Sequence, residues 1–201
     1  MKKILALGML GLLVAMAFAL GTSATFRDYR VQRSTHIAIV ADDSELIDLT
    51  PAQPYAYINE RGKLVIDFSS DNPNWPGHED ANWTNRGLGL SPQSRYNFDH
   101  VFKVSNDLWE NKTILVEVIS SDAGKVSFYD PGENMRVTGG NGTPYNSDTA
   151  AGDVCFYLAP GEELGVGMEL AAPNTLGDYD LTITVMAWPA DDAPFVCGGG
   201  I

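Results

Sequence analysis

The sequence predicts an all-β protein: a two-sheet antiparallel sandwich of jelly-roll type, preceded by an N-terminal signal helix. Short β-branched and aromatic runs recur between clusters of Gly, Pro, Asn and Asp, and several of these runs alternate apolar and polar residues. No amphipathic helical pattern follows the apolar N-terminus. About ten candidate strands, each in need of a covering layer, fit two packed sheets better than one open sheet.

Residues 1–24 have the pattern of a signal peptide. Two lysines precede an apolar run over residues 4–20, and small residues follow it as far as Ala24. Small side chains just before the cut suit signal peptidase, so we expect cleavage between Ala24 and Thr25. The apolar run is also close to the length that spans a bilayer, which makes an uncleaved anchor the alternative.

We expect residues 25–40 to be an extended segment and residues 41–201 to form the sandwich domain. The candidate strands are residues 36–40, 46–49, 55–58, 63–68, 96–104, 113–119, 125–129, 154–158, 164–170 and 179–188.

Alternation predicts which side of a strand is buried. Leu64, Ile66 and Phe68 share one side of their strand, and four residues share one side of the last strand: Leu181, Ile183, Val185 and Ala187. Residues 69–95 and 131–153 lack this period and are expected to be long loops.

The formal net charge is −13, and removal of residues 1–24 takes away two lysines and no acid, which leaves −15. Such a chain is repelled by nucleic acid and by anionic lipid. We therefore expect no nucleic-acid partner, and contact with a membrane only through the signal segment before cleavage.

Acidic and amide side chains cluster at three places, which are residues 42–45, residues 191–192 and the group Asp71, Asn72 and Asn74. Calcium binds oxygen ligands of this kind, but no EF-hand spacing is present. A solvated acidic surface is the favoured interpretation, and calcium is kept as an allowed partner.

Cys155 and Cys197 are the two cysteines of the chain. In an exported protein they predict one disulfide, and closing a loop of roughly 40 residues contributes on the order of 4 kcal/mol to stability. Because Cys197 lies near the end of the chain, a bridge to a neighbouring subunit is the alternative. Three sequons, at Asn82, Asn111 and Asn141, are compatible with N-glycosylation.

No catalytic, cofactor or metal motif is recognisable in the sequence. His36, His78 and His100 lack the spacing of a zinc site, and there is no nucleophile elbow or phosphate-binding glycine loop. Asp99 and His100 are neighbours in a predicted strand, so they should point to opposite faces. Trp75 and Trp83, in one loop, are the best case for a sugar-stacking surface, although loop aromatics usually pack onto the sheet.

Several segments resemble a known family of exported proteins. Residues 21–28 (GTSATFRD) resemble the junction between signal and mature protein in the TasA and camelysin family, whose members form biofilm or surface fibres. Residues 37–49 (IAIVADDSELIDL), 62–66 (GKLVI) and 96–106 (YNFDHVFKVSN) are similar to a related archaeal family that includes bundling pilins. The metallopeptidase activity ascribed to some camelysin relatives is not carried over, because the chain has no metal motif.

The resemblance implies assembly by donor-strand complementation, in which the N-terminal segment of one subunit completes the sheet of the next. The candidate donor is residues 25–40, whose apolar side chains include Phe26, Tyr29, Val31, Ile37 and Ile39. The expected partners are identical subunits in a head-to-tail homopolymer, secreted or held at the cell surface.

A structural fibre or pilus subunit for adhesion or biofilm is thus the leading hypothesis, with no enzymatic activity and no cofactor. Two alternatives stay open: a monomeric cell-surface module that binds sugar or calcium and is attached to the envelope by an uncleaved N-terminus, and a secreted hydrolase of unrecognised type. The donor segment also has an alternative, namely the first strand of a self-contained monomer.

Overall fold

The computed structural model describes residues 46–78, 87–132 and 136–198. The chain divides into two compact units, Met1–Ala38 and Ile39–Ile201, and all described residues belong to the second. The predicted signal helix, the cleavage site and the donor segment lie outside the described residues.

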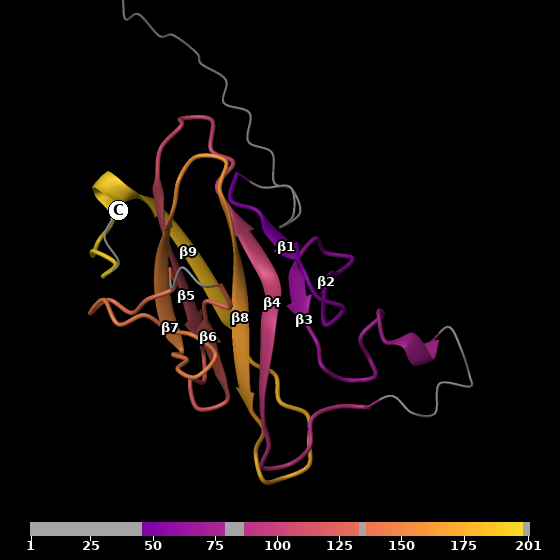
Figure 1. Cartoon of the computed structure of the whole chain (residues 1–201). Coiled ribbons are helices and arrows are strands. Elements are labelled where there is room, and N and C mark those ends of the chain that lie inside the picture. Colours follow the sequence, from indigo (N-terminus) through magenta and orange to yellow (C-terminus); the bar gives the residue numbers. More distant parts are fainter. Residues whose placement is uncertain (1–45, 79–86, 133–135, 199–201) are drawn as a thin grey trace, which may run out of the picture. The chain divides into compact units, whose positions relative to one another are not determined.

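The described ranges are all-β, as predicted, with nine strands and two short 3₁₀ helices (Figure 1). One antiparallel sheet has the order β1-β4-β8-β6 and a second has the order β7-β5-β9. The strands of the first sheet are β1 (Leu49–Pro51), β4 (Arg95–Ser105), β8 (Glu163–Ala171) and β6 (Val126–Tyr129). Those of the second are β7 (Asp153–Leu158), β5 (Ile114–Ser120) and β9 (Ile183–Pro189).

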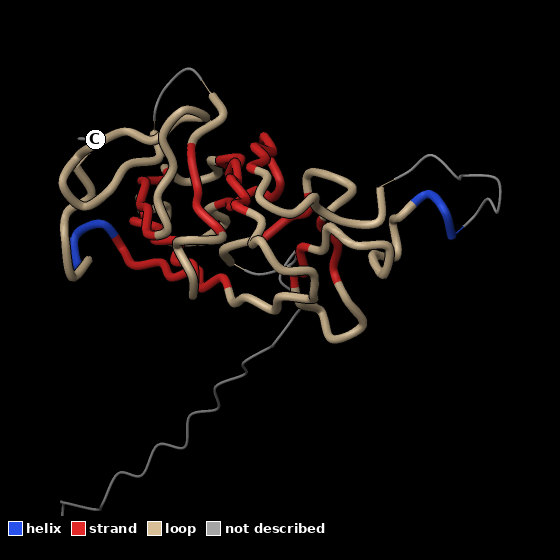
Figure 2. Tube along the Cα trace, turned by 90° about the horizontal axis from the view of Figure 1, so that it is seen from below, coloured by secondary structure: helices blue, strands red, loops and turns tan. Residues whose placement is uncertain are grey.

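A hairpin of β2 (Ala56–Ile58) and β3 (Leu64–Ile66) forms a third, two-stranded sheet. Its turn is organised by Asn59, whose Oδ1 accepts the backbone N–H groups of Arg61 and Lys63 at 2.9 and 3.0 Å. Gly62, with φ of 73°, supplies the left-handed residue of this turn. The 3₁₀ helices are η1 (Pro76–His78) and η2 (Ala190–Asp192), which Figure 2 shows on opposite sides of the strands.

One hydrophobic core joins the two larger sheets. Alternate residues of β5, including Val116 and Val118, meet Phe128 of β6 and Val166 of β8, and all four are fully buried. The predicted alternation is confirmed, since Leu64, Ile66, Phe68, Leu181, Ile183, Val185 and Ala187 all pack against this core.

Three predicted strands have bounds that differ by more than one residue from the observed ones. The strand expected at residues 63–68 ends at Ile66. The strand expected at residues 46–49 occupies Leu49–Pro51, although the carbonyls of Leu46 and Asp48 still accept backbone hydrogen bonds from Asp107 and Ser105, at the end of β4. The last strand begins at Ile183 and not at residue 179. Before it, the Tyr179 hydroxyl is tied back to the backbone carbonyl of Thr175, 3.0 Å away, in a loop.

Strand β4 is interrupted by a bulge. Phe98 pairs with Met168 and Phe102 with Val166, so three residues of β4 lie opposite Gly167 alone. His100 has φ of 50° within this bulge. The irregularity re-aims the side chains between two regular halves of the longest strand.

Candidate functional site

The residues singled out for catalysis do not form a catalytic group. His100 stacks over Gly165 on the outer face of β8, where a Cβ would meet its ring at 2.3 Å. Asp99 lies on the same face and accepts a hydrogen bond from the Tyr129 hydroxyl at 2.7 Å. The prediction that Asp99 and His100 point to opposite faces was therefore wrong, because it assumed a regular strand where the chain has a bulge.

The bulge of β4 accommodates the side chain of Tyr129. Its ring covers Gly167 of β8, and burial first, then the neighbouring carboxylate of Asp99, raises the pKa of its hydroxyl. The phenol therefore acts as a hydrogen-bond donor at ordinary pH. Over the described ranges, no group of three or more His, Cys, Asp and Glu side chains is placed to hold a metal ion.

In the oxygen-rich group of the loop after β3, Asn72 and Asn74 have a structural role. Asn72 is buried, and its amide donates to the carbonyls of Pro54 and Asp67 at 3.2 and 2.7 Å. Asn74 donates to Pro54 as well, at 3.1 Å. These amides point their N–H groups inward, so they hold the loop to the β2–β3 hairpin and offer no oxygen cage to a cation.

The tryptophans that the structure describes lie in different surroundings. Trp75 packs over Gly77 and donates its indole N–H to the carbonyl of Gly87 at 3.1 Å, so these contacts lie within its own loop, whereas contact with the sheet was expected. Trp188 packs edge-on against Phe195. Trp109 is 90% exposed, and Trp83, the proposed partner of Trp75, lies outside the described residues.

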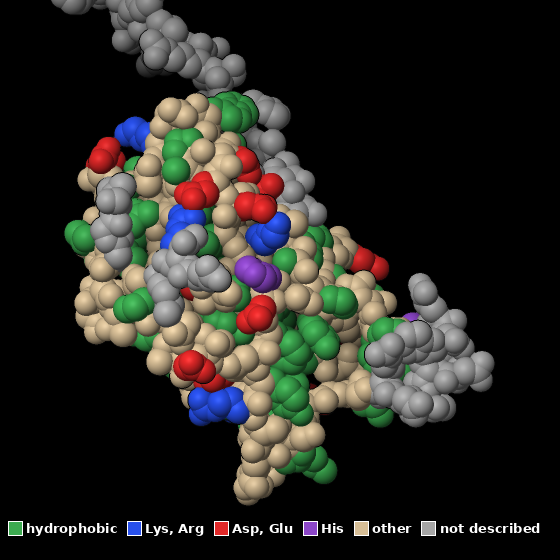
Figure 3. Space-filling view, in the orientation of Figure 1, with side chains coloured by type: hydrophobic (Ala, Val, Ile, Leu, Met, Phe, Trp, Pro, Cys, Tyr) green, Lys and Arg blue, Asp and Glu red, His purple; other side chains and the backbone are tan. Residues whose placement is uncertain are grey.

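Charges on the outer face of the first sheet are paired. Lys103 contacts Glu163 at 2.6 Å and Arg95 contacts Glu169 at 2.7 Å. Figure 3 shows acidic and basic side chains interspersed on this face. A mixed surface of this kind has no single-sign field that would select a charged ligand.

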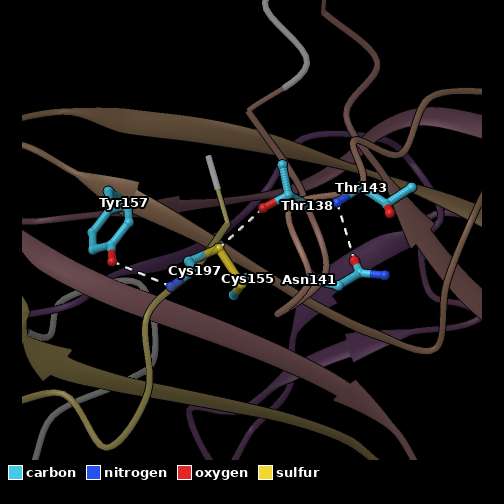
Figure 4. The surroundings of a disulfide bond; sticks show 6 residues. All are labelled: Thr138, Asn141, Thr143, Cys155, Tyr157 and Cys197. Atoms are coloured by element: carbon cyan, nitrogen blue, oxygen red, sulfur yellow. Dashed lines mark hydrogen bonds between the residues drawn. A yellow bond between two sulfur atoms is a disulfide. The ribbon is translucent and has the colours of Figure 1, made fainter. Parts of the chain in front are cut away.

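The predicted disulfide is present within the chain, between Cys155 of β7 and Cys197 of the C-terminal tail (Figure 4). Thr138 lies 3.1 Å from the Cys197 sulfur and, because both sulfurs are bonded, its hydroxyl must be the donor. The backbone N–H of Cys197 donates to the Tyr157 hydroxyl at 3.2 Å. A disulfide is typical of an oxidising environment.

The tail covers the outer face of β5. Leu115 is fully buried there, although its neighbours in sequence face the main core. The second cluster that surrounds it consists of Cys155, Cys197, Tyr157, Ala193 and Phe195.

The outer edge of β7 is closed by a loop. Thr138 and Cys155 exchange both backbone hydrogen bonds, at 2.9 and 2.7 Å. Gly142 of the same loop, with φ of 81°, lies against the tail, where a Cβ would approach the carbonyl oxygen of Gly198 to 2.6 Å. Sequence reasoning missed this closure, because it joins residues far apart in the chain through two glycines and a threonine that show no pattern.

Among the described residues, the outer edge of β9 is unpaired. This strand pairs with β5 on one side, and no strand of the described ranges pairs with it on the other. Its core-facing side chains remain partly exposed, as do those of β3 and β1. A cluster of four aromatic rings, each within 6.0 Å of a neighbour, lies among the residues that precede and follow the β2–β3 hairpin and in β4: Tyr55, Phe68, Phe98 and Tyr96.

Two of the three sequons can be placed. Asn111 and Asn141 are exposed, the first at φ of 53° and the second in the loop that closes β7. Asn82 lies outside the described residues, as do the cleavage residues Ala24 and Thr25 and the five donor residues Phe26, Tyr29, Val31, Ile37 and Ile39.

The model of a protein family, described as a protein of unknown function (DUF1102), matches residues 39–191. The chain belongs to this family. The match contains every described strand and Cys155, but it ends before Cys197. No curated protein matches the chain. No helix within the described ranges is long and apolar enough to cross a membrane.

Proposed function

We propose that this protein is a structural, non-enzymatic subunit of an extracellular fibre or pilus that serves surface adhesion or biofilm formation. After cleavage behind Ala24, the segment 25–40 of one copy completes the sandwich, of jelly-roll type, of the next. The subunit is secreted, and its partner is another copy of itself.

The observation that carries this proposal is the unequal burial of the core at its two sides. Where β6 meets β7, the core residues are closed from solvent: Phe128, Val154 and Phe156 are at most 1% exposed. On the side of β9, Ile183 and Val185 face the same core but remain partly exposed. An additional strand along β9 would remove that apolar surface from water.

The N-terminal segment has the composition of such a strand. Four of the five named apolar donor residues, Tyr29, Val31, Ile37 and Ile39, fall on odd positions and thus on one face of an extended chain, whereas Phe26 falls on the other face. A donor placed in the neighbouring copy forms a heterologous contact, which does not close on itself and so propagates as a filament.

Imaging of the purified mature protein by negative-stain electron microscopy tests the proposal. We expect filaments whose width is that of a few subunits. Monodisperse particles alone, over a range of salt and calcium concentrations, would contradict a fibre.

Deletion of residues 25–31 tests the donor. We expect a folded subunit that no longer polymerises, because the body contains its own core and disulfide. Polymerisation of this variant would exclude the donor role even if the wild-type protein forms fibres.

A further inference from the structure

Along β9, residues whose backbone N–H and C=O groups bond to β5 alternate with residues whose groups point away from β5. The N–H of Ser121 donates to the carbonyl of Thr182 at 2.9 Å, and the N–H of Ala190 donates to Thr113 at 2.9 Å. With the unbroken register between these two bonds, the even-numbered residues of β9 bond to β5. The N–H and C=O groups of Ile183, Val185 and Ala187 therefore point outward.

The same three residues direct their side chains into the core. A strand placed beside β9 would bond to their backbone and at the same time lie over their half-exposed side chains. Backbone pairing and apolar burial are thus available at one edge.

Within the part of the chain that the structure describes, this edge has none of the usual protection against strand addition. Protected edges are short, charged, bulged or covered. Strand β1 has three residues and ends in Pro51, and the edges of β6 and β7 are bridged by Ala151 and Thr138. Strand β9 has seven residues with no charge and no register shift, and its one proline is the last residue, Pro189.

The charges around β9 match those of the N-terminal segment. Exposed aspartates flank the strand at both ends: Asp178, Asp180, Asp191 and Asp192. None of them forms an ion pair with a described residue. Residues 25–40 carry three arginines, Arg27, Arg30 and Arg33, against one aspartate, in a mature chain of net charge −15.

We propose that β9 is the acceptor edge of the fibre, and that its occupant is residues 25–40 of a second copy. The donor bonds to the outward backbone groups of Ile183, Val185 and Ala187, and its arginines lie near the aspartates that flank β9. This inference rests on the proposed fibre function and adds to it the site of strand addition.

The substitution Ala187→Pro tests the acceptor edge. Proline removes an N–H that points outward and places its ring in the path of a donor, while the bonds to β5 from the even-numbered residues stay. We expect the variant to fold and to form no filaments under conditions in which the wild-type protein does. Wild-type-like filaments from the variant would overturn the assignment to β9, whereas absence of filaments from the wild type would count against the fibre itself.

A mixing experiment uses the two defective chains together. The deletion of residues 25–31 lacks a donor but keeps an open β9, and Ala187→Pro keeps the donor but has a blocked β9. Each alone should remain a monomer, and an equimolar mixture should form a 1:1 dimer by light scattering. A mixture that stays monomeric would contradict the proposal.

Amide hydrogen exchange tests the acceptor edge by a measurement that does not require the proline variant to fold. In the chain lacking residues 25–31, the amides of Ile183, Val185 and Ala187 should exchange fast while those of Thr184 and Met186 are protected. In wild-type filaments the odd-numbered amides should become at least ten-fold slower. Equally fast exchange in the two states would overturn the assignment.

Discussion

Strands β7 and β9 flank the same central strand, β5, yet their outer edges are covered to different extents. Val118 of β5 lies between Val154 of β7 and Val185 of β9. Val154 is 1% exposed, whereas Val185 is only partly buried. Because the strand between them is shared, the difference comes from what lies beside and over each outer strand. A loop and a disulfide-bonded tail close β7, and no described segment closes β9.

Removal of the disulfide should have the largest effect on this comparison. The double substitution Cys155→Ser and Cys197→Ser releases the tail that covers Leu115, and we expect a loss of about 2–5 kcal/mol in the free energy of unfolding. Urea denaturation of the mature chain measures it. As a control, a reductant should destabilise the wild-type protein and leave the double variant unchanged. Equal stability of the two proteins would mean that the tail is not needed to close the β7 side.

Truncation of the two valines compares the edges directly. Val154→Ala removes two buried methyl groups and should cost about 2 kcal/mol in the unassembled chain. Val185→Ala, in the matched position on β9, should cost about 1 kcal/mol because its side chain is already partly exposed to water. In filaments the cost of Val185→Ala should rise towards that of Val154→Ala. Equal losses of stability from the two substitutions in the unassembled chain would contradict the difference in burial between the two edges.

The glycine contact between loop and tail offers a smaller test. Gly142→Ala places a Cβ against Gly198 at a positive φ, and we expect a loss of about 1–2 kcal/mol. Gly140→Ala is the matched control, since a Cβ there meets nothing within 4 Å. Thermal unfolding of both variants measures the difference. If Gly140→Ala were the more destabilising of the two, the loop would not dock as described.

The smallest effect concerns Glu117 on β5, between the two edges. Burial, and then the carboxylate of Asp153, raise the pKa of Glu117 above its ordinary value of 4.5. The folded state therefore binds this proton more tightly than the unfolded state, and the charged form subtracts from stability as the pH rises above 4.5. Glu117→Gln should be slightly more stable than the wild type at pH 7, and this advantage should shrink as the pH falls through the raised pKa of the folded state towards 4.5.

Glu162 is the control of opposite sign. Partial burial alone would raise its pKa, but the backbone N–H of Ala159 and the guanidinium of Arg136 together lower it. Its contribution is present above pH 4.5 and is lost as the pH falls below that value. Glu162→Gln should therefore be less stable than the wild type at pH 7. Denaturation at several pH values measures both variants, and shifts of the same sign would contradict this account.

The fold class was predictable because each strand carries its own evidence. Period-two alternation placed Leu64, Ile66, Ile183 and Val185 on the correct side, and the disulfide followed from two cysteines in a chain with an export signal pattern. The bulge of β4 was not predictable, since residues 95–105 read as one uninterrupted strand. Buried polar residues were not predicted either, because local sequence patterns do not show their hydrogen-bond partners.

Asn106 shows what local patterns cannot reveal. It is fully buried, and its amide donates to the carbonyls of Lys112 and Leu158 at 2.9 and 3.0 Å. These bonds tie the loop after β4 to the end of β7, more than 50 positions away in the second case. In a sequence, an asparagine at the end of a strand indicates a turn. Its carbonyl acceptors come close to it only in the folded chain.

The position of the disulfide has a mechanical consequence. Cys155 and Cys197 are 42 residues apart, and β9 lies inside the ring that they close. A load that peels the chain from its C-terminus reaches Cys197 before it reaches Pro189, so β9 cannot be unzipped from that end while the sulfur bridge is intact. The bridge thus anchors the C-terminal end of β9 to β7, on the other side of β5.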